Sequence, residues 1–504
     1  MITRILAAGI VLAAALALPA QARAAGKVAV IVVPLGAQDF SSPLGAHGLL
    51  VVGEGATVSR RGALASLLRG EMGNAVVNGG IPGGKEKISL ATNPAETTFY
   101  LALPPPGMHH NVVRYPIVVF GPGYRGLLTS SATHLTGLIA ISDVAPSVLD
   151  LERGKRPPIR SRTSEAPLAY LRDFDRRLTR AHDSRTGALL VLVGLIVTLG
   201  LAALLTRSAA LGRAAFMSAP VCFAVSLVLS AAGVTGAGDV VLALALGAAA
   251  LSVTAGALLR PRLPLALGLV ALFAFVFVVL WAEPRWNSLA ALGARPDGGG
   301  RFYGVNNQVS TLLLAPALVL GVLAGPALAA VALLVIAGMV ASFIGAQADG
   351  LVVYLAGFLV LALRAGGARP GLRRAAAAVG VAAGAGLALV AIDAAFGGSS
   401  HITHAVGGGP GTLAGDLAHR IHLSAAFVAS RWNEALLFAA SVAAMIGLAL
   451  LRPRLAVLDA LLVGLAVSLL VNDTPTDIAG LGALSAIVLW AWLGRSAERL
   501  DRLD

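Results

Sequence analysis

Long apolar runs recur along the chain from Gly187 onward, and they constrain its fold more than any other feature. Each run is close to the roughly 20 residues that a helix needs to cross the hydrocarbon core of a bilayer. Hydrophobic residues make up 57% of the 504 residues and charged residues only 12%, which is unusual for a soluble globular protein. We therefore predict an all-α polytopic membrane domain of about 11 transmembrane helices.

Loops of very different lengths separate the predicted spans. The spans cover residues 187–205, 214–235, 240–259, 263–282, 308–324, 326–344, 350–363, 375–395, 434–451, 455–471 and 478–494. The run from Thr311 to Ile344 is too long for a single crossing, and Gly325-Pro326 is the natural place for a hairpin within it.

The residues before the first span divide into three parts. Residues 1–25 have the pattern of a secretory signal peptide, with Arg4 ahead of an apolar core and small residues at its end. An uncleaved anchor helix is the alternative, and in both cases the next part of the chain is exported. The predicted parts are an exported α/β domain at 26–152, a solvated stalk at 153–186, the transmembrane domain at 187–495 and a cytoplasmic tail at 496–504.

Short β-rich runs that end in Gly or Pro predict the strands of the exported domain. They cover Val28–Gly36, Gly48–Glu54, Thr97–Pro104 and Tyr115–Gly123. Apolar residues at helical spacing predict a helix over Ser59–Arg69, with Ser59 at its N-cap. A second helix is expected over Ile139–Leu151, broken at Pro146.

The placement of arginine predicts the orientation of the membrane domain. With the exported domain outside and an odd number of crossings, most loop arginines fall on the cytoplasmic side, as the positive-inside rule requires. The outer loops keep Arg285, Arg295, Arg301, Arg420 and Arg431. We expect a multi-pass membrane protein with a cytoplasmic C-terminus. Its net charge of +13 then serves orientation, and no nucleic-acid partner is expected.

This topology places most remaining polar residues of the membrane domain on the outer face, foremost in the loop Glu283–Gln308. Ionisable groups beside apolar runs are costly unless paired or hydrated, so they are candidates for function. The candidate ligand-binding residues are Arg301, Tyr303, Asn306, Asn307, Asp349, Asp393, Asn472 and Asp473. Asp349 and Asp473 are also candidate catalytic residues, with Arg301 as a counter-ion. The alternative is that all are ordinary solvated loop residues.

Four histidines form two pairs at i, i+3 spacing, His401 with His404 and His419 with His422. On a helix this spacing presents imidazoles on one face and suits a zinc-like ion. However, a glycine-rich stretch separates the pairs, and Thr412–Trp432 has the pattern of an amphipathic helix at the membrane interface. The interfacial helix is the preferred interpretation, so no cofactor is predicted, and a metal site is the alternative.

The segment Tyr115–Leu151, which contains the run DVAPSVL, resembles the C-terminal part of alkaline-phosphatase-superfamily domains. The stretch Gly55–Gly70 resembles that family's nucleophile turn and helix, which makes Thr57 or Ser59 the matching hydroxyl and catalytic candidate. In the family a metal-binding Asp ends the first strand, whereas this chain has VPLG at Val33–Gly36. The resemblance therefore implies a degenerate, metal-free α/β domain that binds a ligand or has a structural role.

The whole arrangement is similar to a group of bacterial polytopic membrane proteins that join such a domain to many helices. The matching motifs are GGRFYGVN at Gly299–Asn306 and NDT at Asn472–Thr474. This resemblance implies the bacterial cell envelope, with the lipid bilayer and an envelope glycan or lipid-linked ligand as partners. Three functions stay open. They are the binding, positioning or transport of an envelope lipid, glycan or anionic ligand, a transferase or polymerase reaction on polyprenyl-linked sugars at the outer leaflet, and phosphate or sulfate ester hydrolysis by the exported domain.

Overall fold

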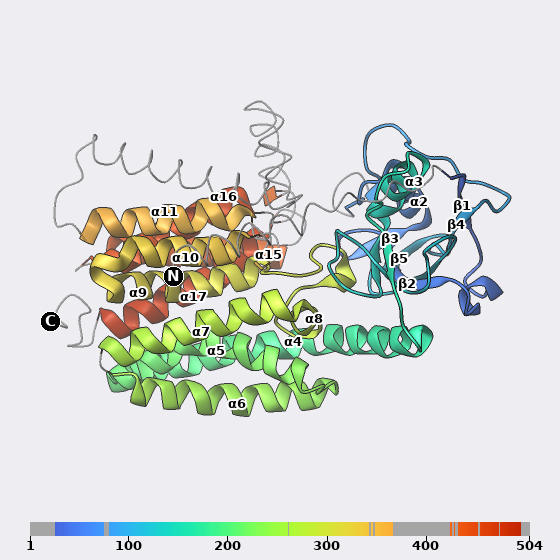
Figure 1. Cartoon of the computed structure of the whole chain (residues 1–504). Helices are drawn as coiled ribbons and strands as arrows, with labels where there is room; N and C mark the ends of the chain where they lie inside the picture. Colours follow the sequence, from blue (N-terminus) through green and yellow to red (C-terminus); the bar gives the residue numbers. More distant parts are fainter. Residues whose placement is uncertain are drawn as a thin grey trace, which may run out of the picture. The chain divides into compact units, whose positions relative to one another are not determined.

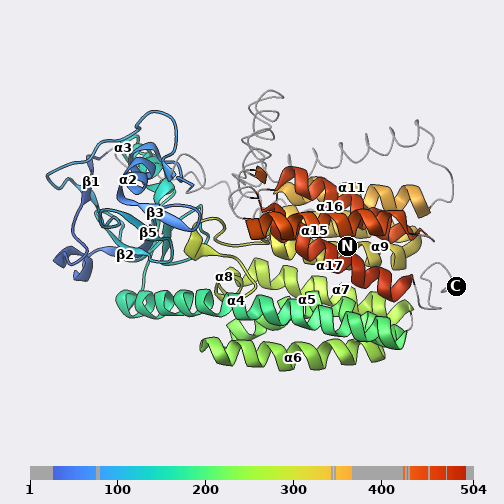
Figure 2. The ribbon, with the colours of Figure 1, turned by 180° about the vertical axis from the view of Figure 1, so that it is seen from behind.

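The computed structural model of the chain describes residues 26–74, 80–260, 262–341, 344–345, 348–365, 424–425, 428, 432–451, 454–472 and 474–494. It divides into two compact units, Met1–Asp173 and Phe174–Asp504, which we call the sheet unit and the helical unit. Figure 1 and Figure 2 show the strands of the first and the long helices of the second from opposite sides. The predicted order, an α/β region followed by a mostly helical region, is confirmed.

The sheet unit is built on one mixed sheet with strand order β1-β4-β6-β2-β7-β9, in which β8 also pairs with β2, and on a second sheet of β3 and β5. The strands are β1 (Val28–Val32), β2 (Ala46–Val51), β3 (Thr57–Ser59), β4 (Thr97–Leu101), β5 (Met108–His110), β6 (Tyr115–Phe120), β7 (Gly126–Thr129), β8 (Leu138–Ala140) and β9 (Arg160–Arg162). The four predicted strands correspond to β1, β2, β4 and β6. Their apolar side chains supply much of the core of the unit, which is why the β-rich runs stand out in the sequence.

The helix predicted after β3 is α2 (Arg60–Arg69), and its predicted cap is confirmed. The Ser59 hydroxyl accepts the Gly62 N–H at 3.1 Å, which satisfies one of the free donors at the helix start. The helix ends at Gly70, whose φ of +62° lies in the left-handed region that favours glycine.

The predicted break at Pro146 is wrong. The helix α3 (Val144–Glu152) runs through this residue after a short 3-10 turn, η3 (Ile141–Asp143). Pro146 lies in the first turn of α3, where an N–H group would have no partner within the helix, so the missing donor costs little. The buried Val144 and Val148 anchor α3 in the core of the sheet unit.

The segment predicted as a solvated stalk, 153–186, has regular structure over much of its length. Its residues Arg160–Arg162 form β9, which pairs antiparallel with β7. From Pro167 the chain is helical as α4 (Pro167–Thr206). Phe174 and Leu178 are buried at helical spacing while charged residues lie between them, so the composition that suggests a stalk belongs to an amphipathic stretch of helix.

The helical unit contains the rest of α4 and a series of further helices that run side by side in both views (Figures 1 and 2). They are α5 (Ala209–Ala231), α6 (Ala237–Leu258), α7 (Arg262–Ala282), α8 (Pro284–Leu289), α9 (Asn307–Ala324), α10 (Leu328–Val340), α11 (Ala348–Ala365), α15 (Trp432–Leu450), α16 (Ala456–Val471) and α17 (Pro475–Leu493). Two 3-10 turns, η4 (Pro296–Gly298) and η5 (Gly325–Ala327), lie before and after α9.

Within the described residues, seven helices are long and apolar enough to cross a membrane, and two shorter apolar helices accompany them at Gly350–Arg364 and Ala456–Val471. The chain therefore has the character of a multi-pass membrane protein. The number of crossings stays a prediction. The predicted span at 375–395, the signal segment 1–25, the tail 496–504 and most of the predicted interfacial helix lie outside the described residues.

The hairpin predicted at Gly325-Pro326 is present. The helix α9 ends at Ala324, and α10 begins after η5. The Val305 N–H donates to the Gly345 carbonyl at 2.6 Å, which joins the chain before α9 to the chain after α10. The two helices therefore return the chain to the end of the unit where the loop 283–306 lies.

Candidate polar site of the helical unit

The loop between α7 and α9, residues 283–306, is a compact structure at one end of the helical unit, and we call it the polar loop. Two buried amides hold its backbone. Asn287 Nδ2 donates to the Gly304 carbonyl at 2.6 Å, and Asn306 Nδ2 donates to the Gly293 carbonyl at 2.7 Å. Because buried backbone groups are costly when unpaired, these bonds fix the course of the loop.

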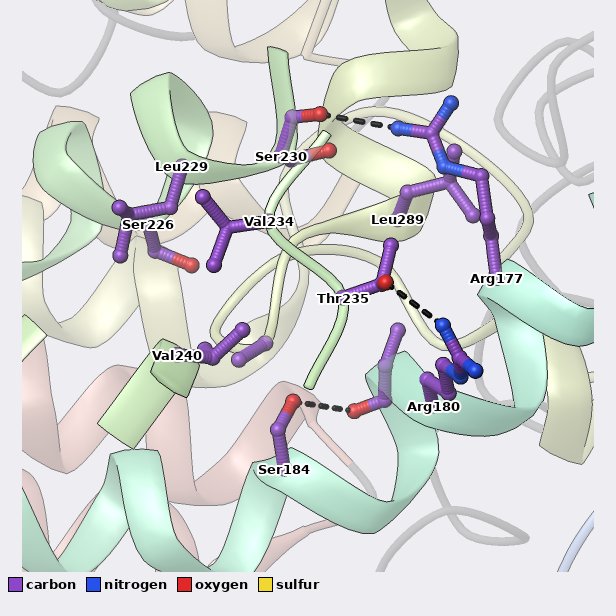
Figure 3. Close-up of a pocket in the computed structure, with 12 residues that line it drawn as sticks. Arg177, Arg180, Ser184, Ser226, Leu229, Ser230, Val234, Thr235, Val240 and Leu289 are labelled. Carbon is purple, nitrogen blue, oxygen red and sulfur yellow. Dashed lines mark hydrogen bonds between the residues drawn. The ribbon is translucent and has the colours of Figure 1, made fainter. Parts of the chain in front are cut away.

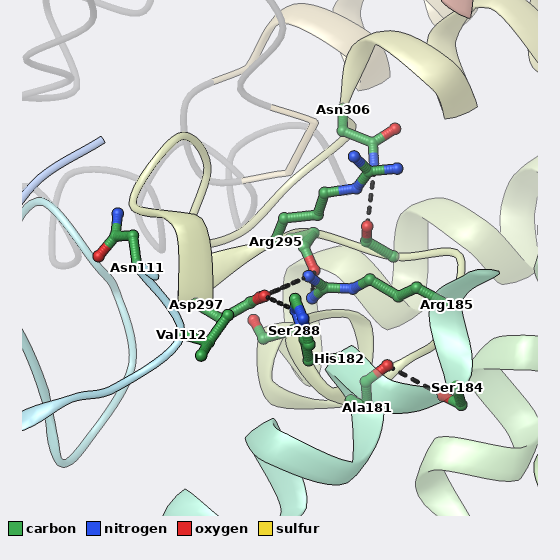
Figure 4. A network of polar contacts seen from close by, with 12 residues as sticks. Asn111, Val112, Ala181, His182, Ser184, Arg185, Ser288, Arg295, Asp297 and Asn306 are labelled. Carbon is green, nitrogen blue, oxygen red and sulfur yellow. Dashed lines mark hydrogen bonds and ion pairs between the residues drawn. The ribbon is translucent and has the colours of Figure 1, made fainter. Parts of the chain in front are cut away.

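Asp297 of the polar loop is 3% exposed, and its carboxylate faces two side chains of α4 (Figure 4). Arg185 Nη1 donates to Asp297 Oδ2 at 2.6 Å, and His182 Nδ1 lies 2.6 Å from the same oxygen. Arg185 Nη2 also donates to the Ala294 carbonyl at 3.2 Å. These contacts attach the polar loop to a helix 112 positions earlier in the chain.

The charge state of Asp297 depends on these neighbours. Burial alone would raise the pKa of this carboxyl group, but the hydrogen bond from His182 and the charge and hydrogen bond of Arg185 outweigh burial and lower the pKa to about 2. Asp297 is therefore ionised at neutral pH. Removing either partner of such a buried pair would leave an uncompensated charge, so the pair constrains the position of the polar loop on α4.

A second chain of polar contacts connects the polar loop with α17. Arg295 Nη2 donates to Gln308 Oε1 at 2.6 Å, and Gln308 Nε2 donates to Asp477 Oδ2 at 2.8 Å. Beside this chain, Asn307 Nδ2 donates to Thr474 Oγ1 at 3.1 Å. Arg295 is exposed and Asp477 is partly buried, so the contacts lead from the surface into the bundle.

Two long helices begin at these contacts. The Asn306 side chain caps α9 by accepting the Val309 N–H at 2.8 Å, and α17 begins directly after Thr474. Free N–H groups give a helix start partial positive charge. The guanidinium group of Arg295 and the two helix starts therefore place positive charge at this end of the unit, beside the carboxylate of Asp477.

Two buried polar atoms mark the same region. Asn472 and Thr476 are each 3% exposed, and Asn472 Oδ1 and Thr476 Oγ1 have no hydrogen-bond partner among the described residues. The other side of the Asn472 amide is satisfied, because Nδ2 donates to Ser468 Oγ at 2.8 Å. Buried polar atoms of this kind are rare, and each calls for a water molecule, an ion or a ligand.

The structure brings some of the predicted binding residues together and gives others a structural role. Asn307 and Asn472 lie in the region of these contacts, whereas both side-chain atoms of Asn306 are used in holding the loop and capping α9. Arg301 and Tyr303 are partly buried in the polar loop, where Arg301 forms an isolated antiparallel bridge with Arg295.

The remaining candidates of the helical unit are placed only in part. Asp349 lies in the first turn of α11. The candidates outside the described residues are Asp393, His401, His404, His419, His422 and Asp473.

The contacts that organise the polar loop are not among the predicted ones. Asp297 falls among glycines in the predicted outer loop, and His182 and Arg185 fall in the predicted stalk. One signal is present in the sequence, because a His and an Arg three positions apart share one face of a helix. No sequence pattern, however, connects that face with an aspartate 112 positions later.

The catalytic candidates of the sheet unit lie at the two ends of β3. Thr57 begins this strand, and the hydroxyl of Ser59, at its other end, caps α2. Within the described residues no group of three or more His, Cys, Asp or Glu side chains has an arrangement that could hold a metal ion.

The run DVAPSVL has an architectural role in the sheet unit. Asp143 accepts hydrogen bonds from the Ser130 hydroxyl and from the Ala132 N–H, the latter at 3.1 Å. Burial raises the pKa of Asp143, and these hydrogen bonds offset part of the effect. Ser147 Oγ donates to the Asp143 carbonyl at 2.6 Å and accepts the Ile159 N–H at 2.9 Å. The polar residues of the run therefore tie neighbouring turns together.

Comparisons of the chain with family models, with curated proteins and with solved structures found no match.

Proposed function

We propose that this protein binds an anionic, hydroxyl-bearing ligand of the bacterial envelope, such as a lipid-linked or polymeric glycan phosphate, at its polar site, and positions or transports it. The observation that carries the proposal is the chain of contacts Arg295–Gln308–Asp477. It joins residues 169 positions apart at the starts of two apolar helices. Membrane insertion does not require polar side chains to gather at one place. Because polar groups beside apolar helices are costly, their convergence here indicates a function.

The chemistry of the site supports this class of ligand. Arg295 and the two helix starts attract anionic oxygens. Asn472 Oδ1 accepts hydrogen bonds only, and Thr476 Oγ1 both donates and accepts. A ligand that combines phosphate oxygens with hydroxyl groups satisfies all of these atoms, whereas a fully deprotonated anion such as sulfate has no donor for Asn472 Oδ1.

A membrane transferase acting on polyprenyl-linked sugars is the second candidate, and Asp477 is the observation that favours it. This carboxylate lies in the first turn of α17 and is connected to Arg295 through Gln308. A transfer reaction at a diphosphate needs a base beside a cation that neutralises the leaving group. In both candidates the polar site faces the outside of the cell, as the placement of arginine predicts.

A profile of lipid-linked precursors and cell-wall polymers in a deletion strain tests both candidates. Wild-type protein is expected to restore the profile, and the variant Arg295→Gln with Asp477→Asn is expected to fail although it reaches the membrane in normal amount. Arg262→Gln, at the other end of the helical unit, is the matched control and is expected to restore the profile. Accumulation of a lipid-linked precursor favours the transferase, a redistributed but chemically unaltered polymer or lipid favours binding and transport, and full restoration by the double variant contradicts both.

A further inference from the structure

A small cavity of the helical unit shares no residue with the contacts of the polar site. It lies between α4, α5, the turn that leads into α6, and Leu289 and Ala291 of the polar loop (Figure 3). Its volume is about 20 Å³, enough for one water molecule. Among the described residues that line it none is acidic, and two are arginines, Arg177 and Arg180. We call it the arginine cavity.

Hydrogen bonds fix both guanidinium groups at this cavity. Arg177 Nη2 donates to the Ser230 carbonyl at 2.9 Å, and Arg180 Nη1 donates to Thr235 Oγ1 at 2.8 Å (Figure 3). The two arginines are three positions apart and therefore project from one face of α4. A guanidinium group has five N–H donors in a planar fork, which matches the oxygens of a phosphate group.

A buried hydroxyl supplies a second, independent sign of a ligand. Ser230 lines the arginine cavity and is 4% exposed, and its Oγ atom has no hydrogen-bond partner among the described residues. A neighbouring serine, Ser226, shows the usual outcome, because its Oγ accepts the Leu292 N–H at 3.1 Å. A buried hydroxyl of this kind calls for a partner, and the cavity has room to supply one through a single water molecule.

The arginine cavity lies where the apolar helices begin. Thr235 and Val240, which line it, flank the start of α6. Gly187, seven positions after Arg180, packs so closely on α6 that a Cβ atom there would come within 2.5 Å of Val241 Cγ2. Beyond this contact Leu190 is 67% exposed, which is expected of a surface that faces lipid. The span predicted at 187–205 puts this cavity at the depth of lipid phosphates, with an apolar surface beside it for acyl chains.

We propose that the arginine cavity binds the phosphate group of an anionic membrane lipid. The guanidinium groups of Arg177 and Arg180 bind the phosphate oxygens, and a water molecule in the cavity links the phosphate to the Ser230 hydroxyl. The phosphate lies at the mouth, because the cavity itself holds only one water molecule. The proposal does not rest on the ligand proposed for the polar site.

Native mass spectrometry and thermal unfolding of the full-length protein in nanodiscs test the proposal. The probes are phosphatidylglycerol added to phosphatidylcholine, and inorganic phosphate added to phosphatidylcholine alone. Wild-type protein is expected to retain phosphatidylglycerol and to unfold at a higher temperature in its presence. Arg177→Gln with Arg180→Gln is expected to weaken this binding at least about tenfold, and Ser230→Ala about threefold.

The matched control is Arg172→Gln with Arg176→Gln, which removes the same charge from two exposed positions of α4 that do not line the cavity. It is expected to change phosphatidylglycerol binding less than twofold.

An equal loss in the control and the cavity variant would show that general attraction between cations and anionic lipid accounts for binding, and would overturn the proposal. So would stabilisation by inorganic phosphate that equals that of the lipid, because the source would then be a free anion. Equal unfolding temperatures of both variants in phosphatidylcholine alone confirm that neither change disrupts folding.

Discussion

The two ends of the helical unit use polar residues in different ways. At the end formed by the polar loop, side chains bond to other side chains and form chains, as Arg295, Gln308 and Asp477 do. Among the described residues at the opposite end, two arginines bond to backbone carbonyls at the ends of helices, and a single ion pair, from Arg364 Nη2 to Asp459 Oδ2 at 2.6 Å, joins the end of α11 to the start of α16. Arg213 Nε donates to the Gly256 carbonyl near the end of α6 at 3.1 Å, and Arg262 Nε donates to the Leu323 carbonyl near the end of α9 at 3.3 Å.

The arginine–carbonyl bonds at the opposite end are helix caps, whereas the contacts at the polar-loop end form a linked network. The last carbonyls of a helix have no partner within it and carry partial negative charge, so an arginine there has a sufficient structural reason. The contacts of the polar loop instead join the loop to α4 and to α17. A change within a network affects several partners together, whereas changes at separate caps add independently.

The largest expected effect comes from breaking the network at Asp297. Asp297→Ala leaves the guanidinium group of Arg185 beside His182 without its carboxylate, and losing one partner of a buried ion pair costs about 3–5 kcal/mol. The measurement is reversible unfolding of the purified protein in detergent. Asp297→Asn, which keeps a hydrogen-bond acceptor, is expected to lose less. A loss below about 1 kcal/mol for the alanine variant would mean that the ion pair does not hold the loop.

A smaller loss is expected at the opposite end. Arg213 is 2% exposed, and Arg213→Met keeps much of its volume but removes the bond to Gly256, for an expected loss of about 2 kcal/mol. Combined with Asp297→Ala, the two losses should add to within about 0.5 kcal/mol, since the ends are separated by helices roughly 30 Å long. Strong coupling between the two changes in the same unfolding assay would contradict the separation of caps from network.

The architecture is largely readable from the sequence because its causes are local. The strands β1, β2, β4 and β6, the cap at Ser59 and the hairpin at Gly325-Pro326 each depend on neighbouring residues. The prediction at Pro146 is wrong because the effect of a proline depends on where in the helix it lies.

The candidate site is predictable only in its location. Asn307 and Asn472 stand out since they interrupt apolar runs, but the pairing of Asn307 with Thr474 spans 167 positions and has no local signal. The predicted spans 187–205 and 214–235 leave Arg213 in the cytoplasmic loop between them, whereas this residue lies within α5 and is buried. Side chains on distant helices become partners only when the helices pack against one another. The sequence alone does not predict which helices pack together, so it does not predict these pairs.

The last expected effect, no larger than the loss at Arg213, is a pH dependence that arises from Asp297 at the polar-loop end. The pKa of Asp297 is about 2 in the folded protein, below the value of about 3.9 for an unfolded chain. Because the folded pKa is lowered, the carboxylate stabilises the protein above about pH 4, and this contribution of about 2 kcal/mol is lost as the pH falls towards 2. The arginines at the opposite end keep their charge over this range.

In unfolding measurements from roughly pH 6 to pH 2, wild-type protein should lose more stability than Asp297→Asn, while Arg213→Met should follow the wild-type slope. Parallel slopes for wild type and Asp297→Asn would show that the ionised carboxylate does not contribute to stability at this end.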